Sequence, residues 1–136
     1  MPAYAARSLT GDSIRLGGDG PPTVLNVWAT WCTSCREEMA LLDSVTARVT
    51  PRGARVVAVS VDESETERVR RYVESSGVRF IVAHDQAGEV ERSFAVMGVP
   101  TTFVIDRTGR LVWSHTGNLG GARSALDSAV ERALSR

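Results

Sequence analysis

Two cysteines three positions apart, Cys32 and Cys35, are the residues of this chain best suited to carry out chemistry. They are its only cysteines. A disulfide that closes so short a loop removes little entropy from the unfolded chain, so a structural cross-link explains the pair poorly. A thiolate is the nucleophile of disulfide exchange, and the pair therefore predicts thiol–disulfide chemistry.

The elements predicted around the pair favour a reactive Cys32. Residues 24–29 are mostly apolar and β-branched or aromatic, which is typical of a strand covered on both faces. From 33 to 50 apolar residues recur at helical spacing until Pro51. Cys32 then lies at a helix start, where unpaired N–H groups and the helix dipole stabilise an anion. We expect Cys32 to attack and the more buried Cys35 to resolve the mixed disulfide.

The rest of the chain alternates between strand-like and helix-like stretches, which indicates an α/β protein. Ser64 and Glu67 are spaced as a capping box for a helix that ends at Gly77. Apolar patterns and turn residues predict the remaining elements: a hairpin over 4–16, strands over 55–61 and 80–82, a short helix over 90–95, an antiparallel hairpin of 101–105 with 111–115, and a C-terminal helix with its apolar face at 122–133.

Other uses of two cysteines fit less well. A zinc site needs four ligands, but there is no second cysteine pair, and His84 and His115 stand alone in separate segments. Covalent haem attachment needs a histidine directly after the second cysteine, where this chain has Arg36. A pair of inert buried thiols stays open as the plainest alternative. The two histidines and Asp62 are interpreted as ordinary loop or strand-end residues.

Composition narrows the class of protein. The 136 residues are 43% hydrophobic and 24% charged, which is typical of one globular domain, and we predict a single domain over 1–136. Sixteen acidic residues balance sixteen basic ones, all arginine, so we expect no nucleic-acid partner. The first thirty residues contain no apolar run of signal-peptide length, which leaves a cytoplasmic protein or one whose export segment is missing from the sequence.

Two segments carry a resemblance to a known family. Residues 26–38, which read NVWATWCTSCREE, resemble the active-site segment of the TlpA/ResA-like branch of the thioredoxin superfamily. Residues 97–106 resemble the segment that holds the family's cis-proline, here Pro100. The resemblance implies a thioredoxin-like fold, with a central mixed sheet and helices on both faces. Residues 23–136 would form its core, and 1–22 an N-terminal extension with the hairpin.

The resemblance also implies roles for individual residues. Cys32 and Cys35 would be catalytic as a redox-active disulfide, with no other cofactor and no metal. Glu38, three residues after Cys35, would move a proton, although a solvated glutamate in the first helical turns is the competing interpretation. The family's proline two residues beyond is Ala40 here, which predicts a straighter helix. Contact with substrate would come from four further residues: Trp31, Val99, Pro100 and Thr101. Trp28 is expected in the core.

The function implied is reduction of disulfides in other proteins, outside the cytoplasm rather than inside it, for example in cytochrome c maturation. The partners would be a protein thiol or disulfide substrate and a membrane or thioredoxin-type electron donor, and the protein would be a monomer. A peroxidase of peroxiredoxin type is one alternative, but it needs a threonine three residues before its cysteine, where Ala29 stands. Another is a copper-binding or metal-delivery module, whose nearest methionine, Met97, is expected in the core.

Overall fold

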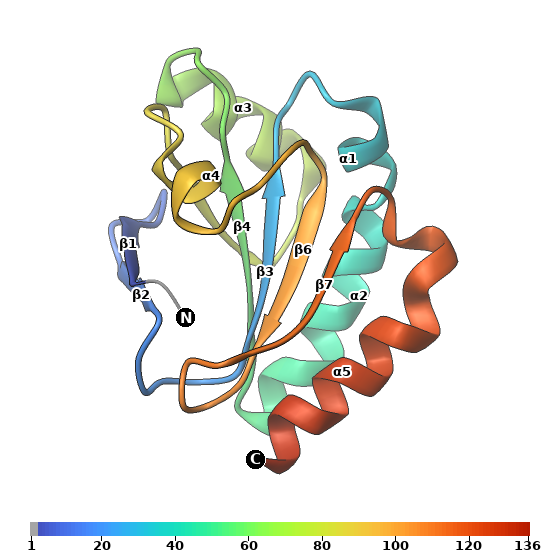
Figure 1. Ribbon diagram of the computed structural model, residues 1–136. Coiled ribbons are helices and arrows are strands. Elements are labelled where there is room, and N and C mark those ends of the chain that lie inside the picture. The colour runs from blue at the N-terminus through green and yellow to red at the C-terminus, as the bar shows by residue number, and fades with distance from the viewer. Residues whose placement is uncertain (1–2) are drawn as a thin grey trace.

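The computed structural model describes residues 3–136 and consists of a two-stranded hairpin and a five-stranded sheet flanked by helices (Figure 1). In chain order, the strands and helices are β1 Tyr4–Arg7, β2 Ser13–Leu16, β3 Thr23–Trp28, α1 Thr33–Glu37, α2 Met39–Val49, η1 Thr50–Arg52, β4 Arg55–Ser60, α3 Thr66–Ser76, β5 Ile81–His84, α4 Glu89–Ser93, β6 Thr101–Ile105, β7 Leu111–Thr116, η2 Leu119–Ala122 and α5 Arg123–Ser135.

The strand that precedes Cys32 is the centre of the large sheet, whose order is β5-β4-β3-β6-β7. β3 is buried at all six positions and pairs in parallel with β4 and antiparallel with β6. The register sets Asn26 opposite Thr102 of β6. A continuous apolar run fits such a strand because neighbours cover both of its edges and helices cover its faces.

Alternate residues of β3 point to opposite faces of the sheet, and each face meets a helix. Trp28 packs against Tyr72 of α3, with ring centroids 5.8 Å apart. Phe103 of β6, which pairs with Leu25, packs on the other face against Phe94 beside α4, at 5.2 Å. The sheet is therefore mixed and has helices on both faces, which confirms the predicted thioredoxin-like fold.

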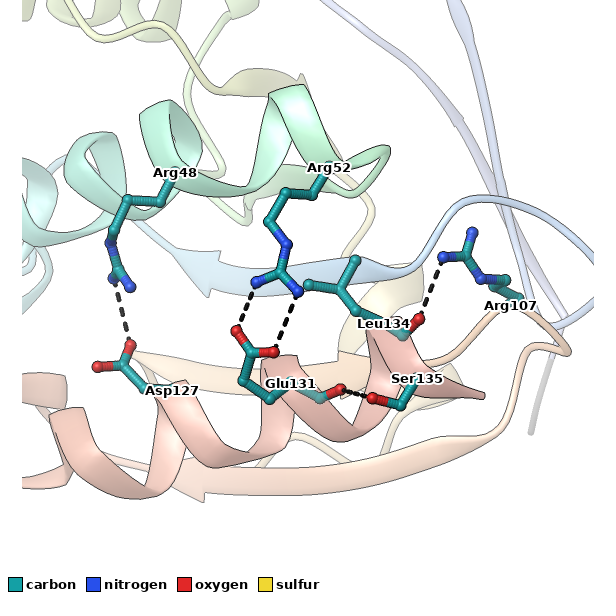
Figure 2. Close-up of polar contacts among 7 residues, drawn as sticks. All are labelled: Arg48, Arg52, Arg107, Asp127, Glu131, Leu134 and Ser135. Atoms are coloured by element: carbon teal, nitrogen blue, oxygen red, sulfur yellow. Dashed lines mark hydrogen bonds and ion pairs between the residues drawn. The ribbon is translucent and has the colours of Figure 1, made fainter.

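Helix α2, with the η1 turn that follows it, runs beside α5 (Figure 2). Two ion pairs join their outer surfaces, one from Arg48 of α2 and one from Arg52 of η1. Arg48 Nη2 lies 3.2 Å from Asp127 Oδ1, and Arg52 Nη2 donates to Glu131 Oε2 at 3.1 Å. All four side chains are about half exposed. Exposed ion pairs contribute little to the stability of a protein. Packing of the buried faces of α2 and α5 therefore holds the two helices on the sheet.

The predicted N-terminal hairpin is present as β1 and β2, in antiparallel register. Tyr4 fixes it to the sheet, since its ring packs against Phe94 at 6.1 Å and its hydroxyl donates to Asp85 at 2.9 Å. The loop after β2 passes so close to the β6–β7 turn that a Cβ at Gly109 would lie 2.7 Å from the backbone N of Gly18. Gly109 also has a φ of 85°, which a glycine adopts without strain.

Two local predictions are wrong. The chain does not continue as one straight helix past Cys35, because Glu38 leaves helical geometry with ψ at 0° and divides α1 from α2 without any proline. The capping box of Ser64 and Glu67 does not form either. Helix α3 begins one residue later, with Glu65 at the N-cap and no side-chain cap, so Ser64 lies outside the helix. Among residues 3–136, no helix combines the length and apolar character needed to cross a membrane.

Candidate active site

Cys32 is the N-cap of α1, in the turn that follows β3. It is joined to Cys35 in a disulfide, and the two Cα atoms lie 5.2 Å apart. The backbone N–H of Cys35 donates to Cys32 Sγ at 3.1 Å. In the reduced protein that donor would face the Cys32 thiolate, where together with the helix start it favours the charged form. Cys32 is 7% exposed and Cys35 only 1%, which makes Cys32 the sulfur nearer to solvent.

The two tryptophans near the cysteines lie in opposite environments, as expected. Trp28 is fully buried, whereas 68% of Trp31 is exposed directly beside Cys32. A cleft of about 500 Å³ opens next to Trp31, and Asp62, Glu63 and Arg68 lie along it. The residue before the nucleophile therefore presents an apolar surface at the edge of a polar cleft.

The active-site turn is anchored through Asp62, a residue interpreted from the sequence as an ordinary loop or strand-end residue. Asp62 is only 2% exposed, and its carboxylate accepts the backbone N–H of Thr30 at 2.9 Å and the Thr30 hydroxyl at 2.6 Å. The backbone carbonyl of Asp62 lies 2.8 Å from His84 Nε2. Asp62 follows β4, the parallel neighbour of β3, and the carboxyl ends of parallel strands meet at one edge of a sheet. The place of Asp62 directly after a strand predicted to lie parallel to β3 was the sequence feature that could have indicated this contact.

The bond between Val99 and Pro100 is cis, as predicted. Pro100 is buried and Val99 is partly exposed. Thr101 is 4% exposed, and its hydroxyl donates to the Gly98 carbonyl at 2.6 Å, so its side chain is directed into the protein. Contact of Val99, Pro100 and Thr101 with a substrate stays a prediction, and for Thr101 it would involve the backbone.

Glu38 is buried, with 2% of its surface exposed, so its interpretation as a solvated glutamate is wrong. Oε1 accepts the side-chain amide of Asn26 at 2.9 Å, and Oε2 accepts the backbone N–H of Leu119 at 2.9 Å. Burial raises the pKa of Glu38, while these two donors and the charge of His115 act in the opposite direction without cancelling it. A buried carboxyl of raised pKa keeps its proton to a higher pH than a solvated one and can exchange it with a neighbouring group.

Residues 117–119, the two-residue turn after β7 and the first residue of η2, complete the site and were not foreseen. They contact Pro100, Ser34 and Glu38, respectively. The three are a glycine, an asparagine and a leucine, which do not form a recognisable motif.

The expectation for Met97 is wrong, because this methionine is 93% exposed rather than part of the core. It lies in the loop that leads to Pro100, outside regular structure. His84 and His115 end up in separate places, His84 against Asp62 and His115 stacked on Trp113 with centroids 5.7 Å apart. In the described part of the chain, no three histidine, cysteine or acidic residues are grouped so that they could hold a metal ion.

Comparison with known proteins gives a consistent result. The model of the AhpC/TSA family matches residues 2–114. Thiol-disulfide oxidoreductase ResA of Bacillus thuringiensis subsp. konkukian is 30% identical over 117 residues, which are 85% of this chain and 67% of that protein. Thiol:disulfide interchange protein DsbE of Yersinia pestis is 35% identical over 124 residues, 88% of this chain and 63% of that protein.

Among solved structures, the crystal structure of a putative thiol:disulfide interchange protein DsbE from Chlorobium tepidum superposes with a TM-score of 0.87. It is 31% identical, and the match covers 98% of this chain and 94% of that one. StoA from Bacillus subtilis, at 20% identity and a TM-score of 0.79, shares the fold. The match to the Chlorobium tepidum protein thus spans nearly the whole arrangement of hairpin, sheet and helices.

Proposed function

This chain belongs to the AhpC/TSA family and is a thiol–disulfide oxidoreductase of the ResA type, and from that premise we propose that it reduces disulfide bonds in other proteins. The observation that carries the proposal is the position of Cys32, at the start of α1 with the Cys35 N–H on its sulfur. That position stabilises a thiolate on the more accessible of the two sulfurs.

The proposed reaction has two exchange steps. The Cys32 thiolate attacks one sulfur of a substrate disulfide, so a mixed disulfide forms while the substrate's own S–S bond breaks and one substrate cysteine leaves as a thiolate. Cys35 then loses its proton and attacks Cys32 Sγ. The Cys32–Cys35 disulfide forms, and the second substrate cysteine leaves as a thiolate. Two electrons pass from the dithiol of this chain to the substrate.

Glu38 is proposed to accept the proton that Cys35 must lose. It lies three residues after Cys35, at the break between α1 and α2, and both residues are buried. Burial keeps its pKa above that of an ordinary glutamate. A carboxyl with a pKa closer to neutral is a better match for exchanging a proton with a thiol than a solvated one would be.

The substrate is proposed to lie along Trp31 and the segment Val99–Thr101. Trp31 offers an exposed aromatic surface next to Cys32. A large aromatic side chain beside the reacting atom contributes contact area with little loss of conformational freedom. The residue before the cis-proline would offer its backbone to an extended substrate segment.

The proposed compartment and electron donor are supported by the family resemblance. We propose action outside the cytoplasm, on protein disulfides such as those that arise in cytochrome c maturation, with electrons supplied by a membrane or thioredoxin-type dithiol. No nucleic acid takes part, and the protein acts as a monomer.

Trapping tests the reaction. The reduced protein is mixed with a disulfide-containing unfolded protein, and products are separated without reductant. We expect Cys35→Ser to accumulate a mixed disulfide through Cys32, since the resolving sulfur is missing, and Cys32→Ser to form none. Wild-type rates of disulfide reduction by Cys32→Ser would overturn the assignment.

The reduction potential of the Cys32–Cys35 pair tests the direction of electron flow. A value near that of thioredoxin, roughly −270 mV, is expected for a reductase. A value near roughly −120 mV, which is typical of a strong oxidant, would reverse the direction proposed.

A further inference from the structure

The turn after β7 contacts three separate parts of the active site. The Gly117 N–H donates to the Pro100 carbonyl at 2.8 Å, and the Leu119 N–H donates to Glu38 Oε2 at 2.9 Å. Between them, Asn118 Nδ2 lies 3.1 Å from both the carbonyl oxygen and the hydroxyl oxygen of Ser34. Ser34 is one of the two residues that separate the cysteines.

The Ser34 carbonyl needs such a donor because α1 is short. A helix leaves its last four carbonyls without partners in the helix, and α1 contains only five residues. The N–H of Glu38, which would bond to Ser34 in a continuing helix, is directed to the Arg36 carbonyl instead. The amide of Asn118 thus replaces a bond that the break at Glu38 removes.

Asn118 is itself held in the orientation that this contact needs. Its Oδ1 accepts the backbone N–H of Gly120 at 2.8 Å, as the N-cap of η2, which leaves Nδ2 facing Ser34. Its backbone carbonyl lies 3.2 Å from His115 Nε2. The oxygen and the NH₂ group of the Asn118 side chain are both used, so this side chain joins η2 to α1, the helix that carries the cysteines.

We propose that Asn118 is a positioning residue for the Cys32–Cys35 pair, a role that rests on the proposed function. By holding Ser34, it keeps α1 in the geometry in which the Cys35 N–H points at Cys32 Sγ. By capping η2, it keeps the Leu119 N–H on Glu38. Asn118 touches neither sulfur and acts through these neighbours.

The test is the pH dependence of alkylation of the reduced protein by iodoacetamide, in which the Cys32 thiolate forms a C–S bond and iodide leaves. Asn118→Ala removes all three side-chain hydrogen bonds, two to Ser34 and one from Gly120. Because Asn118 is exposed, we expect normal folding, with alkylation below the midpoint about two- to fivefold slower and the midpoint at higher pH. A role confined to stability would not move that midpoint.

Asn118→Ser is the matched variant. Serine is a good N-cap and can still accept the Gly120 N–H, but it is too short to reach Ser34. We expect the same upward shift as in Asn118→Ala. No shift in Asn118→Ala, or wild-type behaviour of Asn118→Ser, would overturn the proposal. A wild-type midpoint at the ordinary thiol pKa of about 8.5 would instead count against the proposed function, whatever the variants do.

Discussion

Glu38 and Leu119, 81 positions apart in the chain, meet inside the protein, where Oε2 of the carboxylate accepts the leucine's backbone N–H at 2.9 Å. The other oxygen accepts the amide of Asn26. Oδ1 of Asn26 has no hydrogen-bond partner among the described residues. The Glu38 carboxyl thus lies between two hydrogen-bond donors, from Asn26 and Leu119, and beside the unpaired Oδ1 of Asn26. Burial raises the pKa of Glu38, and the two donors offset that rise only in part.

Glu38→Gln is expected to change how stability depends on pH. Because the folded state raises the pKa of Glu38, the folded protein binds more protons than the unfolded chain between the ordinary pKa and the raised one. The wild-type free energy of unfolding should therefore fall as pH rises through this window, and the variant should lack that fall. Urea unfolding at a series of pH values measures both curves.

Three carboxylates with lowered pKa, Asp43, Asp106 and Glu131, do not interfere, because their contributions to stability are lost only as pH falls below the ordinary pKa of each group. Glutamine is nearly isosteric, and its amide can donate to Asn26 once the Asn26 amide turns to present Oδ1. In turnover, we expect Glu38→Gln to lose about 10²-fold, the lower end for a proton-transfer group. If the free energies of unfolding of the wild type and of Glu38→Gln run parallel across these pH values, Glu38 does not titrate in this range.

Leu119→Pro is expected to shift the pH dependence of disulfide exchange upward. Leu119 opens η2, where proline is tolerated, and Asn118 before it has φ −63° and ψ 136°, which suits a residue preceding proline. The substitution removes the N–H that stabilises the Glu38 carboxylate, so the pKa of Glu38 should rise further.

Leu119→Ala is the control, since it shortens the same buried side chain, at a cost of roughly 2–4 kcal/mol, and keeps the N–H. Rates of reduction of a protein disulfide from pH 5 to 9 compare the two. If the rates of Leu119→Pro and Leu119→Ala depend on pH in the same way, the Leu119 N–H does not act on Glu38.

Asp62→Asn should loosen the turn that carries Trp31 and Cys32. An amide replaces the carboxylate only in part: its oxygen can keep the Thr30 N–H and its NH₂ group can donate to the Thr30 hydroxyl, but both bonds lose the negative charge that strengthens them. We expect a loss of about 1–3 kcal/mol in the free energy of unfolding, as for a buried charged hydrogen bond. Slower trapping of the mixed disulfide should accompany it.

Thr30→Val separates the two contacts, since it removes the hydroxyl bond to Asp62 and keeps the backbone bond. It should have the smaller effect on trapping. Stability measurements that leave Asp62→Asn equal to wild type would contradict an anchoring role.

The residues that the sequence made predictable are those whose signal is local. Cys32 and Cys35 lie on one helical turn, and Pro100 directly precedes a recognisable strand. The residues that escaped prediction act over long separations. Asp62 reaches Thr30 across 32 positions, and Asn118 reaches Ser34 across 84. No local pattern encodes such contacts, because they depend on which strands become neighbours.

The break at Glu38 escaped prediction for a related reason. Ala40 favours a continuous helix, but the backbone turns where the glutamate side chain enters the protein to meet β3 and η2. Tertiary contacts thus override the helical preference of the segment. For Met97 the sequence predicted a tertiary contact that does not form. This apolar residue lies shortly before a core strand and was expected in the core, but it is exposed.

Cys35→Ser distinguishes disulfide reduction from peroxide reduction. A peroxidatic cysteine reacts alone: its thiolate attacks one oxygen of hydrogen peroxide, the O–O bond breaks, and a sulfenic acid forms while hydroxide leaves and takes up a proton to become water. Such a site should still consume peroxide in Cys35→Ser when a small thiol is supplied to reduce it.

Here the residue three before Cys32 is Ala29, which is fully buried and has no hydroxyl to orient a peroxide. We therefore expect Cys35→Ser to consume peroxide no faster than Cys32→Ser, the matched control. Rapid consumption that requires Cys32 but not Cys35 would establish a peroxidase and remove the basis for assigning Cys35 as the resolving thiol.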